Sequence, residues 1–336
     1  MSQTVLQHIW TVFVSPVLRN GLAALPIRPP IMKSAIAFHR KILRGILKFS
    51  SVSPIAPLYF LLGELPIEGV IHLDTFSLFW SIWANPQTKI HEIVKYLLKM
   101  TNSSSVTWSA HVRILFSMYN LPDPLSLISG SLWPKEKWKV VTKTAVTAYY
   151  ERFWRYKATL NSKLGFLNIQ ATGLAGRVHP VLSGIMTTQE VMRSRVHVKM
   201  LAGDYPCQAY LGNERSRDSA CPLCQYLYPG SQAPDETMVH LITRCRATSD
   251  TRAAYFHVLM NTIASHFPQN QILSHPNSTQ LTQLVLDPTS LNLPLSIRIH
   301  PDHPALAQIL VACRTLCYAI HRDRNRLLER IRDFKK

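Results

Sequence analysis

Three cysteines and one histidine lie close together in the pattern Cys221-x2-Cys224-x15-His240-x4-Cys245. Zinc is bound in proteins by four thiolate or imidazole ligands in a tetrahedron, and two short-spaced pairs joined by a loop of roughly ten to twenty residues can supply them. Pro222 would stiffen the tight turn that lets the first two thiolates reach one ion. The spacing therefore predicts a Zn²⁺ site of the CCHC knuckle type, with no open position left for catalysis.

The geometry of the second ligand pair can be predicted as well. Asp235 is placed to cap a short helix that begins at Glu236 and carries His240, because an N-cap carboxylate accepts hydrogen bonds from the first amides of a helix. Five residues separate His240 from Cys245, a rotation of about 500° that leaves the side chains about 140° apart on a regular helix. The helix is therefore expected to end or distort before Cys245.

The remaining cysteines do not share this spacing. Cys207 is interpreted as a buried thiol, with substitution for a zinc ligand as the alternative. Cys313, Cys317 and His321 would suit a second metal by their spacing, but they continue the apolar side of one helix, and core packing is the preferred interpretation. Six cysteines in 336 residues are too few for the disulfide framework of a secreted protein, so we expect an intracellular location, nuclear or cytoplasmic.

The charge of the chain limits the kind of partner. It contains 37 Lys and Arg against 19 Asp and Glu, a formal net charge of +18, while 47% of its residues are hydrophobic. This apolar content suffices for folded cores and excludes a disordered basic tail. The large positive excess favours a polyanionic partner, either a nucleic acid or an acidic membrane surface. No small-molecule substrate is expected.

Apolar stretches of the chain are interrupted by charge or proline. Arg19 and Asn20 interrupt the first stretch, and Glu64, Pro66 and Glu68 interrupt the next. The positive charges of the first segment follow its apolar run, whereas those of a signal peptide precede it. We therefore expect no membrane partner, and the predicted partner is RNA or DNA, bound largely without sequence specificity.

The first 63 residues carry seven basic residues and no acidic one. Apolar residues recur there at steps of three and four through residues 4–25 and 31–48, which predicts two helices separated by prolines. In the second helix, Arg40, Lys41 and Arg44 lie opposite the apolar stripe. This side is interpreted as a nucleic-acid-binding face, and a solvated helix face is the alternative.

Residues 132–164 combine eight basic and seven aromatic residues with only two acidic ones. Lys and Arg bind phosphates by charge, and aromatic faces stack with bases, which is worth about 1–3 kcal/mol per base. The pattern favours single-stranded or distorted nucleic acid. The alternative is that the aromatic residues pack into a helical core while the lysines extend outward. The predicted contact residues are Lys137, Lys139, Lys143, Arg152, Trp154, Arg155 and Lys157.

Periodicity along the chain predicts a mainly α fold, with helical bundle-like segments and a small CCHC zinc knuckle. Pro, Asp, Ser and Gly cluster in residues 120–130 and indicate a joint between two units. Residues 305–336 are predicted to form one long helix with a basic end. The expected segments are a helical region 1–125, a basic and aromatic helical segment 131–200, the zinc knuckle 201–250 and a helical C-terminal region 251–336.

The segment CPLC, followed by ETMVHLITRC, resembles the zinc-knuckle region that closes the polymerase of many non-LTR (LINE-type) retrotransposons. Upstream, SPVLRNGLAAL, AFHRKILRGIL and LYFLLGELPIEG are similar in order to the segment after the polymerase palm, and RVHVKMLAGDYPCQAYLGNER to the stretch before the knuckle. The resemblance covers roughly residues 8–250 and implies a thumb and connector in 1–125, followed by a zinc-binding, nucleic-acid-binding region. The family's knuckle pattern falls on Cys221, Cys224, Glu236, Thr237, His240, Leu241 and Cys245.

The residues of polymerase chemistry are absent from the sequence. A reverse transcriptase holds its catalytic metals with carboxylates that include an Asp-Asp step, and no Asp-Asp pair occurs in this chain. There is also no His-Glu-x-x-His helix and no phosphate-binding Gly-rich loop. The chain is therefore expected to be a non-catalytic, zinc- and nucleic-acid-binding fragment or derivative of such a polymerase. A zinc-stabilised protein-interaction or structural module is the alternative.

Overall fold

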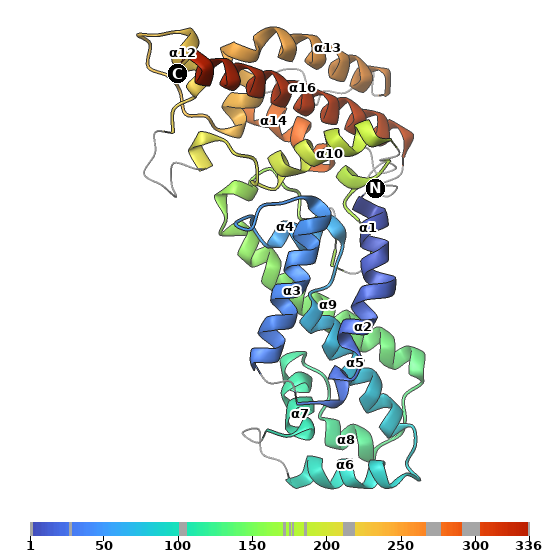
Figure 1. Ribbon diagram of the computed structural model, residues 1–336. Coiled ribbons are helices and arrows are strands. Elements are labelled where there is room, and N and C mark those ends of the chain that lie inside the picture. The colour runs from blue at the N-terminus through green and yellow to red at the C-terminus, as the bar shows by residue number, and fades with distance from the viewer. Residues whose placement is uncertain are drawn as a thin grey trace.

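Helices make up the regular structure in the computed structural model of the chain (Figure 1). Among the residues that it describes there is no strand, and extended segments pair only in one isolated bridge between Ala220 and Asp235. The predicted mainly α fold is confirmed. The described residues are 3–26, 29–100, 106–170, 173–174, 176, 178–184, 187–210, 219–266, 277–290 and 303–334.

The molecule is elongated, with three successive groups of helices (Figure 1). One end contains α6 (Lys89–Met100), α7 (Trp108–Met118) and α8 (Pro124–Ser129). The middle contains α1 (Gln3–Ile9), α2 (Ser15–Arg19), α3 (Pro29–Leu47), α4 (Ala56–Leu62), α5 (Ile67–Trp83) and α9 (Lys135–Thr159). The other end contains α10 (Thr188–Leu201), α12 (Pro222–Leu227), α13 (Ser249–His266), α14 (Ser278–Leu286) and α16 (Pro304–Phe334).

Seven short helical segments complete the described structure. Two have the wide π pattern, Trp10–Val14 and His240–Arg244. The 3₁₀ turns are Leu22–Ala24, Ser162–Leu164, Pro180–Leu182, Arg246–Thr248 and Pro288–Ser290.

The first predicted helix, residues 4–25, is divided in the structure. The π segment Trp10–Val14 separates α1 from α2, and Pro16 stands at the beginning of α2. Proline has no N–H to donate within a helix, and here the turn before it takes the wider i→i+5 pattern, from Ser15 N to Trp10 O. The second predicted helix, residues 31–48, corresponds to α3.

The longest helix of the middle group, α9, is held by a single stripe of side chains. The stripe repeats every four residues and packs against α4 and α5, with helix formation starting directly after Pro134. Glycine at position 69 of α5 permits the close approach, because a Cβ there would lie 2.7 Å from the Tyr150 ring. The buried members of the stripe are Trp138, Thr142, Val146, Tyr150, Trp154 and Ala158.

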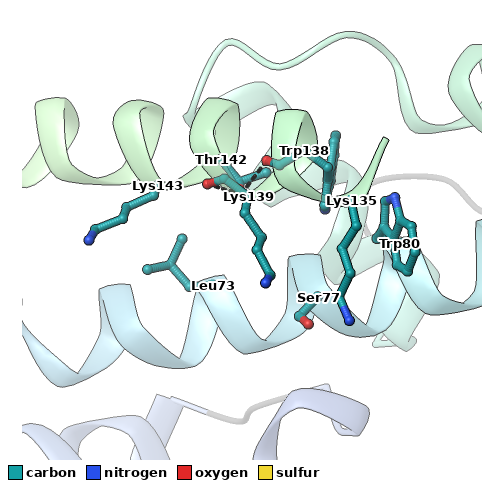
Figure 2. Close-up of a pocket in the computed structure, with 8 residues that line it drawn as sticks. All are labelled: Leu73, Ser77, Trp80, Lys135, Trp138, Lys139, Thr142 and Lys143. Carbon is teal, nitrogen blue, oxygen red and sulfur yellow. Dashed lines mark hydrogen bonds between the residues drawn. The ribbon is translucent and has the colours of Figure 1, made fainter. Parts of the chain in front are cut away.

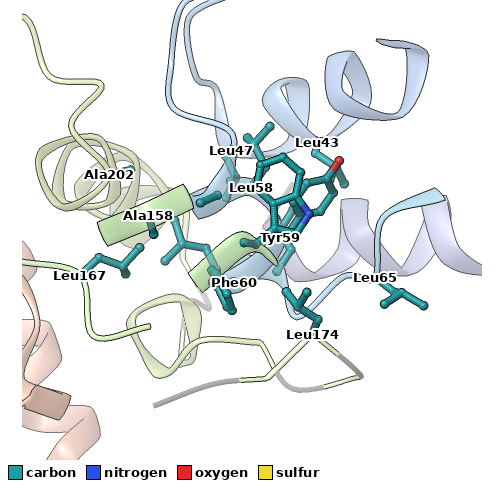
Figure 3. Packing of buried hydrophobic residues seen from close by; sticks show 14 of the residues in the cluster. Leu43, Leu47, Leu58, Tyr59, Phe60, Leu65, Ala158, Leu167, Leu174 and Ala202 are labelled. Carbon is teal, nitrogen blue, oxygen red and sulfur yellow. The ribbon is translucent and has the colours of Figure 1, made fainter. Parts of the chain in front are cut away.

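One hydrophobic core runs through most of the molecule. Figure 3 shows side chains of α3, α4 and α9 meeting around Tyr59, which has no exposed surface. The cluster has members from Trp10 to Ile320, and residues of both the expected region 1–125 and the expected segment 131–200 belong to it. In the predicted joint at 120–130 the structure has α8, whose Leu127 and Ile128 are buried. The expected boundary near residue 125 therefore does not separate two cores.

The C-terminal helix α16 (Pro304–Phe334) corresponds to the long helix predicted for residues 305–336. It is long and apolar enough to cross a membrane by length and composition alone, although Arg314 interrupts its apolar stretch. In the structure, 56% of its most apolar window is buried inside the protein. Within this window Arg314 is buried and donates a hydrogen bond to Val181 O at 3.0 Å, as in a helix of a protein core.

Candidate metal centre and basic helices

The four predicted ligands come together at one end of the molecule. Cys221 and Cys224 lie at the start of α12, His240 begins the π segment, and Cys245 directly follows that segment. All four side chains are buried, and their ligand atoms lie within 4.8 Å of one another. The chain therefore has a Cys3His cluster that could hold a metal ion.

The distances within the cluster suit a tetrahedral ion. Cys224 Sγ lies 3.5 Å from His240 Nε2 and 3.9 Å from Cys245 Sγ. With metal–sulfur bonds of about 2.3 Å and metal–nitrogen bonds of about 2.0–2.1 Å, the edges of a zinc tetrahedron are about 3.6 Å and about 3.8 Å. The donors are thus already close to the separations that zinc requires.

Backbone pairing closes the loop between the two ligand pairs. Cys221 N donates to Pro234 O at 2.8 Å, and Glu236 N donates to Ser219 O at 2.9 Å. These bonds flank the Ala220–Asp235 bridge. The two ends of the loop are therefore fixed side by side, which brings the first ligand pair next to the second.

The predicted distortion of the helix before Cys245 is confirmed. Residues His240–Arg244 form a π turn, and Cys245 has extended backbone angles of φ −62° and ψ 117°. Cys245 N donates to His240 O at 2.7 Å, the i→i+5 bond of a π turn. This wider turn brings the two side chains together, which a regular helix would hold apart.

The predicted capping by Asp235 is wrong. Asp235 lies in the bridge with Ala220 and accepts a hydrogen bond from Ser219 Oγ at 2.5 Å. The capping oxygen belongs to Thr237, whose Oγ1 accepts from His240 N at 3.1 Å. The helical turn starts two residues later than expected, because Glu236 is drawn into the core instead.

The cysteine thiols of the cluster influence one another. Hydrogen bonding with Cys245, and then burial, raises the pKa of the Cys221 thiol to about 12. The same hydrogen bond lowers the pKa of Cys245, while burial raises that of Cys224. Three buried thiols this close do not all ionise without a cation between them, so metal binding must release protons.

Glu236 connects the cluster to α16. Its carboxylate has no exposed surface and accepts two hydrogen bonds from Arg324, at 2.7 Å from Nε and 2.9 Å from Nη2. It also accepts from Gln208 N at 2.8 Å, while Arg324 donates to Pro206 O at 2.9 Å. Nothing in the spacing of the sequence signals this pair, because its members are 88 residues apart.

The three cysteines of the candidate metal centre belong to a small hydrophobic cluster of their own. Cys221, Cys224 and Cys245 pack with Leu223 and with Ile331 near the end of α16. The cluster is separate from the main core, whose last member on α16 is Ile320. The last turns of α16 are thus anchored on the metal centre.

The other cysteines do not join this centre. Cys207 is fully buried in the main core, and burial raises its pKa to about 12. Cys313 and Cys317 also lie in the main core. The ring nitrogens of His321 lie 3.0 Å from Tyr205 Oη and 3.1 Å from Asn325 Nδ2. The core interpretation holds for the three cysteines, whereas His321 is half-buried beside Tyr205.

The basic residues of α3 mostly serve the fold. Arg40 is half-buried, donates to Tyr59 Oη at 3.3 Å, and lies over the Trp154 ring. Arg44 is also half-buried and donates to Ser53 Oγ at 3.3 Å. Of the three residues predicted to bind nucleic acid on this helix, only Lys41 is exposed.

On α9 two of the predicted contact residues are buried or half-buried, and the other five are exposed. Trp154 is only 6% exposed, so its selection as a stacking residue is wrong, and core packing holds for this ring. Arg155 is half-buried over Phe60 and donates to Gln170 Oε1 at 2.8 Å. The exposed set consists of Lys137, Lys139, Lys143, Arg152 and Lys157.

Aromatic residues of this segment that were not among the predicted contact residues accompany these cations. Lys137 Nζ lies 4.5 Å from the centre of the Trp133 ring, and Lys157 Nζ lies 5.8 Å from that of Phe153. Phe153 is 42% exposed and Tyr156 is 61% exposed. The accessible aromatic surface of α9 therefore belongs to Phe153, Tyr156 and Tyr149, which is 37% exposed.

The chain was also compared with known proteins. No family model, curated protein or solved structure matches it. Its function must therefore be argued from the Cys3His cluster and from the charge of its exposed helices.

Proposed function

We propose that this chain is a non-catalytic, zinc-stabilised module that binds RNA or DNA mainly by charge. The observation that carries the proposal is the set of six exposed cations on α9, namely the five exposed residues of the prediction and Lys135. Only two acidic residues, Glu136 and Glu151, stand on the same helix, and the whole chain has a net charge of +18. Exposed cations without matching acids create the positive field to which a polyanion binds.

Zinc is the metal that we propose for the Cys3His cluster. Thiolate and imidazole donors at tetrahedral separations are the ligands that zinc prefers, and four protein ligands leave no position for a reactive water. The proposed role is structural. When bound, the ion would hold the loop after Cys221, the π turn and the end of α16 in one unit.

We further propose that the chain derives from the region downstream of the catalytic palm in a non-LTR retrotransposon reverse transcriptase. The order of three sequence motifs and the clustering of the four knuckle ligands support this origin. The absence of an Asp-Asp step from the sequence supports a role without polymerase activity. The proposed contribution is to hold nucleic acid.

The zinc assignment is tested by metal analysis of the purified protein. We expect one zinc per chain in the unaltered protein and in Cys207→Ser, which changes a buried cysteine outside the cluster. Cys224→Ser is expected to lose the metal, because serine is a poor zinc ligand. Equal zinc content in both variants would contradict the assignment.

Nucleic-acid binding is tested by fluorescence anisotropy with labelled RNA and DNA. Affinity should fall steeply between 50 and 300 mM salt, with a log–log slope of about −4 if five phosphates are contacted. Serine substitution of Lys137, Lys139, Lys143, Arg152 and Lys157 on α9 should remove most of the binding. The control replaces Lys89, Lys95 and Lys99 on α6 by serine. A salt-independent affinity, or equal losses in both variants, would contradict the proposal.

A protein-interaction module is the second candidate, and one surface of α6 favours it. Four apolar side chains on this helix are exposed although they follow helical spacing, and we call them the α6 apolar face. Their exposure ranges from 38% to 65%. Lys89 and Lys99 are exposed on the same helix, and Glu92 is its single acidic residue. The members of the face are Ile90, Ile93, Leu97 and Met100.

The charge around the α6 apolar face indicates which kind of partner we propose for it. Lysines around an apolar stripe complement a partner helix with acidic residues beside its own apolar stripe. A synthetic amphipathic peptide with Glu flanks should bind, and the same peptide with Lys flanks should not. Ile93→Ser with Leu97→Ser should abolish this binding without changing nucleic-acid affinity. Equal binding of both peptides would contradict this candidate.

A further inference from the structure

A groove of about 220 Å³ lies between α5 and α9 (Figure 2). Helix α5 contributes Leu73 and Trp80 to its lining, and α9 contributes Lys135, Lys139 and Lys143. One side of the groove therefore offers apolar surface and the other offers ammonium groups. The volume is smaller than the roughly 300–1,000 Å³ of pockets for drug-sized ligands, so the groove has room for one small group.

The three lysines follow one another at steps of four residues. Such residues lie on one side of a helix, about 6 Å apart along its axis. In Figure 2 their side chains extend from α9 toward α5. Lys139 pairs with Glu136 at 3.2 Å, but both side chains are more than half exposed, so the pair is weak. Asp74, which follows Leu73 on α5, is occupied by Arg19 at 2.6 Å.

The apolar wall is held in place by the fold. Trp80 Nε1 donates to Trp133 O at 3.0 Å, which fixes the orientation of the indole ring. Lys135 Nζ lies 5.5 Å from the centre of that ring. A cation thus lies over the aromatic face, and the two together offer the groups that contact a phosphate and a base.

We propose that this groove holds one nucleotide of a single-stranded nucleic acid. The base would lie against Leu73 and Trp80, with neighbouring phosphates on Lys135, Lys139 and Lys143. A duplex keeps its bases stacked inside, so only an unpaired base can enter a recess of this kind. The inference rests on the proposed nucleic-acid binding and assigns it a defined site and strand preference.

The test measures binding of a twelve-nucleotide uridine strand and of a twelve-base-pair duplex. Replacing Lys135, Lys139 and Lys143 by serine should lower single-strand affinity at least about tenfold more than the triple replacement on α6, and flatten the salt slope by about two. Trp80→Leu should weaken single-strand binding at least about fivefold, with an unchanged salt slope and unchanged duplex affinity.

A second variant tests the groove independently, in case Trp80→Leu does not fold. Ser77 is exposed and lines the groove, so Ser77→Glu places a carboxylate at the site without disturbing the core. It should reduce single-strand binding more than duplex binding. Inorganic phosphate at 10 mM serves as the probe for simple anion binding, and it should not displace the strand.

The outcomes separate the two proposals. If no nucleic acid binds at low salt, the proposed function fails together with the groove. If the protein binds, but the groove variants lose no more affinity than the α6 control, the groove proposal is overturned while the proposed function stands. Equal losses for strand and duplex, or displacement by phosphate, also overturn it.

Discussion

At the scale of single residues, Glu236 shows how a buried charge can join distant parts of a chain. Its carboxylate meets Arg324 on α16 and the backbone before α12, with no surface exposed to solvent. Removing both charges from water is costly, and direct hydrogen bonds offset that cost only while the pair is intact. Glu236 therefore holds α16 against the segment that carries the Cys3His cluster.

We expect Glu236→Gln to lower the free energy of unfolding by about 3–5 kcal/mol, because it leaves the Arg324 guanidinium buried without a counter-charge. Urea unfolding followed by circular dichroism measures the change. Glu329→Gln alters an exposed carboxylate on the same helix and should change the free energy by less than about 0.5 kcal/mol. Similar losses in the two variants would show that the buried pair does not stabilise the fold.

The Cys3His cluster could be predicted from the sequence, and so could the distortion between His240 and Cys245, because ligand spacing and helix rotation are local constraints. The role of Glu236 could not be predicted from the sequence. Its partner Arg324 is fixed by tertiary packing and lies 88 residues away. Asp235 was misassigned for the same reason, since the bridge to Ala220 decides its place.

At the scale of elements, α9 shows the limit of periodicity. The helix and its basic character could be predicted, but not which aromatic rings are accessible. Trp154 is buried while Phe153, its neighbour, is 42% exposed. A four-residue repeat drifts by about 40° per step around a helix, so the buried stripe follows the neighbouring helices rather than a fixed face. Which aromatic rings of α9 are buried depends on where α4 and α5 pack against it.

The contact between α5 and α9 depends on the missing side chain at position 69. Gly69→Ala should destabilise the protein by about 1–3 kcal/mol, because the added Cβ would stand 2.7 Å from the buried Tyr150 ring. Thermal or urea unfolding measures the loss. The matched control is Gly45→Ala on α3, where a Cβ meets nothing within 4 Å. Equal stability of Gly69→Ala and the control would show that the helices can separate without cost.

At the scale of the whole molecule, buried histidines couple stability to pH. Burial, and then the charge of Arg40, lowers the pKa of His39 to about 3. Burial, and then the charge of His111, lowers the pKa of His72 to about 3. Burial and Arg314 lower that of His197 to about 4. In the unfolded chain these imidazoles titrate near 6.5, so between these values the unfolded state binds more protons than the folded state.

Stability should therefore be complete above pH 6.5 and fall as the pH decreases toward 4, by up to about 1.4 kcal/mol per pH unit for each histidine. His72→Gln should flatten this dependence, whereas His257→Gln, at an exposed position, should not. Urea unfolding at pH 4.5, 5.5, 6.5 and 7.5 measures it. Metal release in acid affects all variants alike. The difference between their pH profiles therefore measures the contribution of the substituted histidine. Identical profiles would contradict the assignment.

The arrangement of the two hydrophobic clusters predicts how the molecule responds to metal removal. The main core ends on α16 at Ile320, while Leu327, Leu328 and Ile331 pack with the cysteines of the metal centre. If zinc holds that cluster together, a chelator removes the anchor of the last turns of α16 but leaves the main core intact.

Hydrogen exchange measured with and without chelator tests this division. Protection should be lost in residues 219–248 and 325–334, and retained in α5 and α9, which pack on each other far from α12 and the Cys3His cluster (Figure 1). Cys224→Ser should give the same pattern without chelator, whereas Cys207→Ser should not. Loss of protection in α9 would mean that the metal supports the whole fold. Retention of protection at the end of α16 would mean that Glu236 and Arg324 hold this helix without the ion.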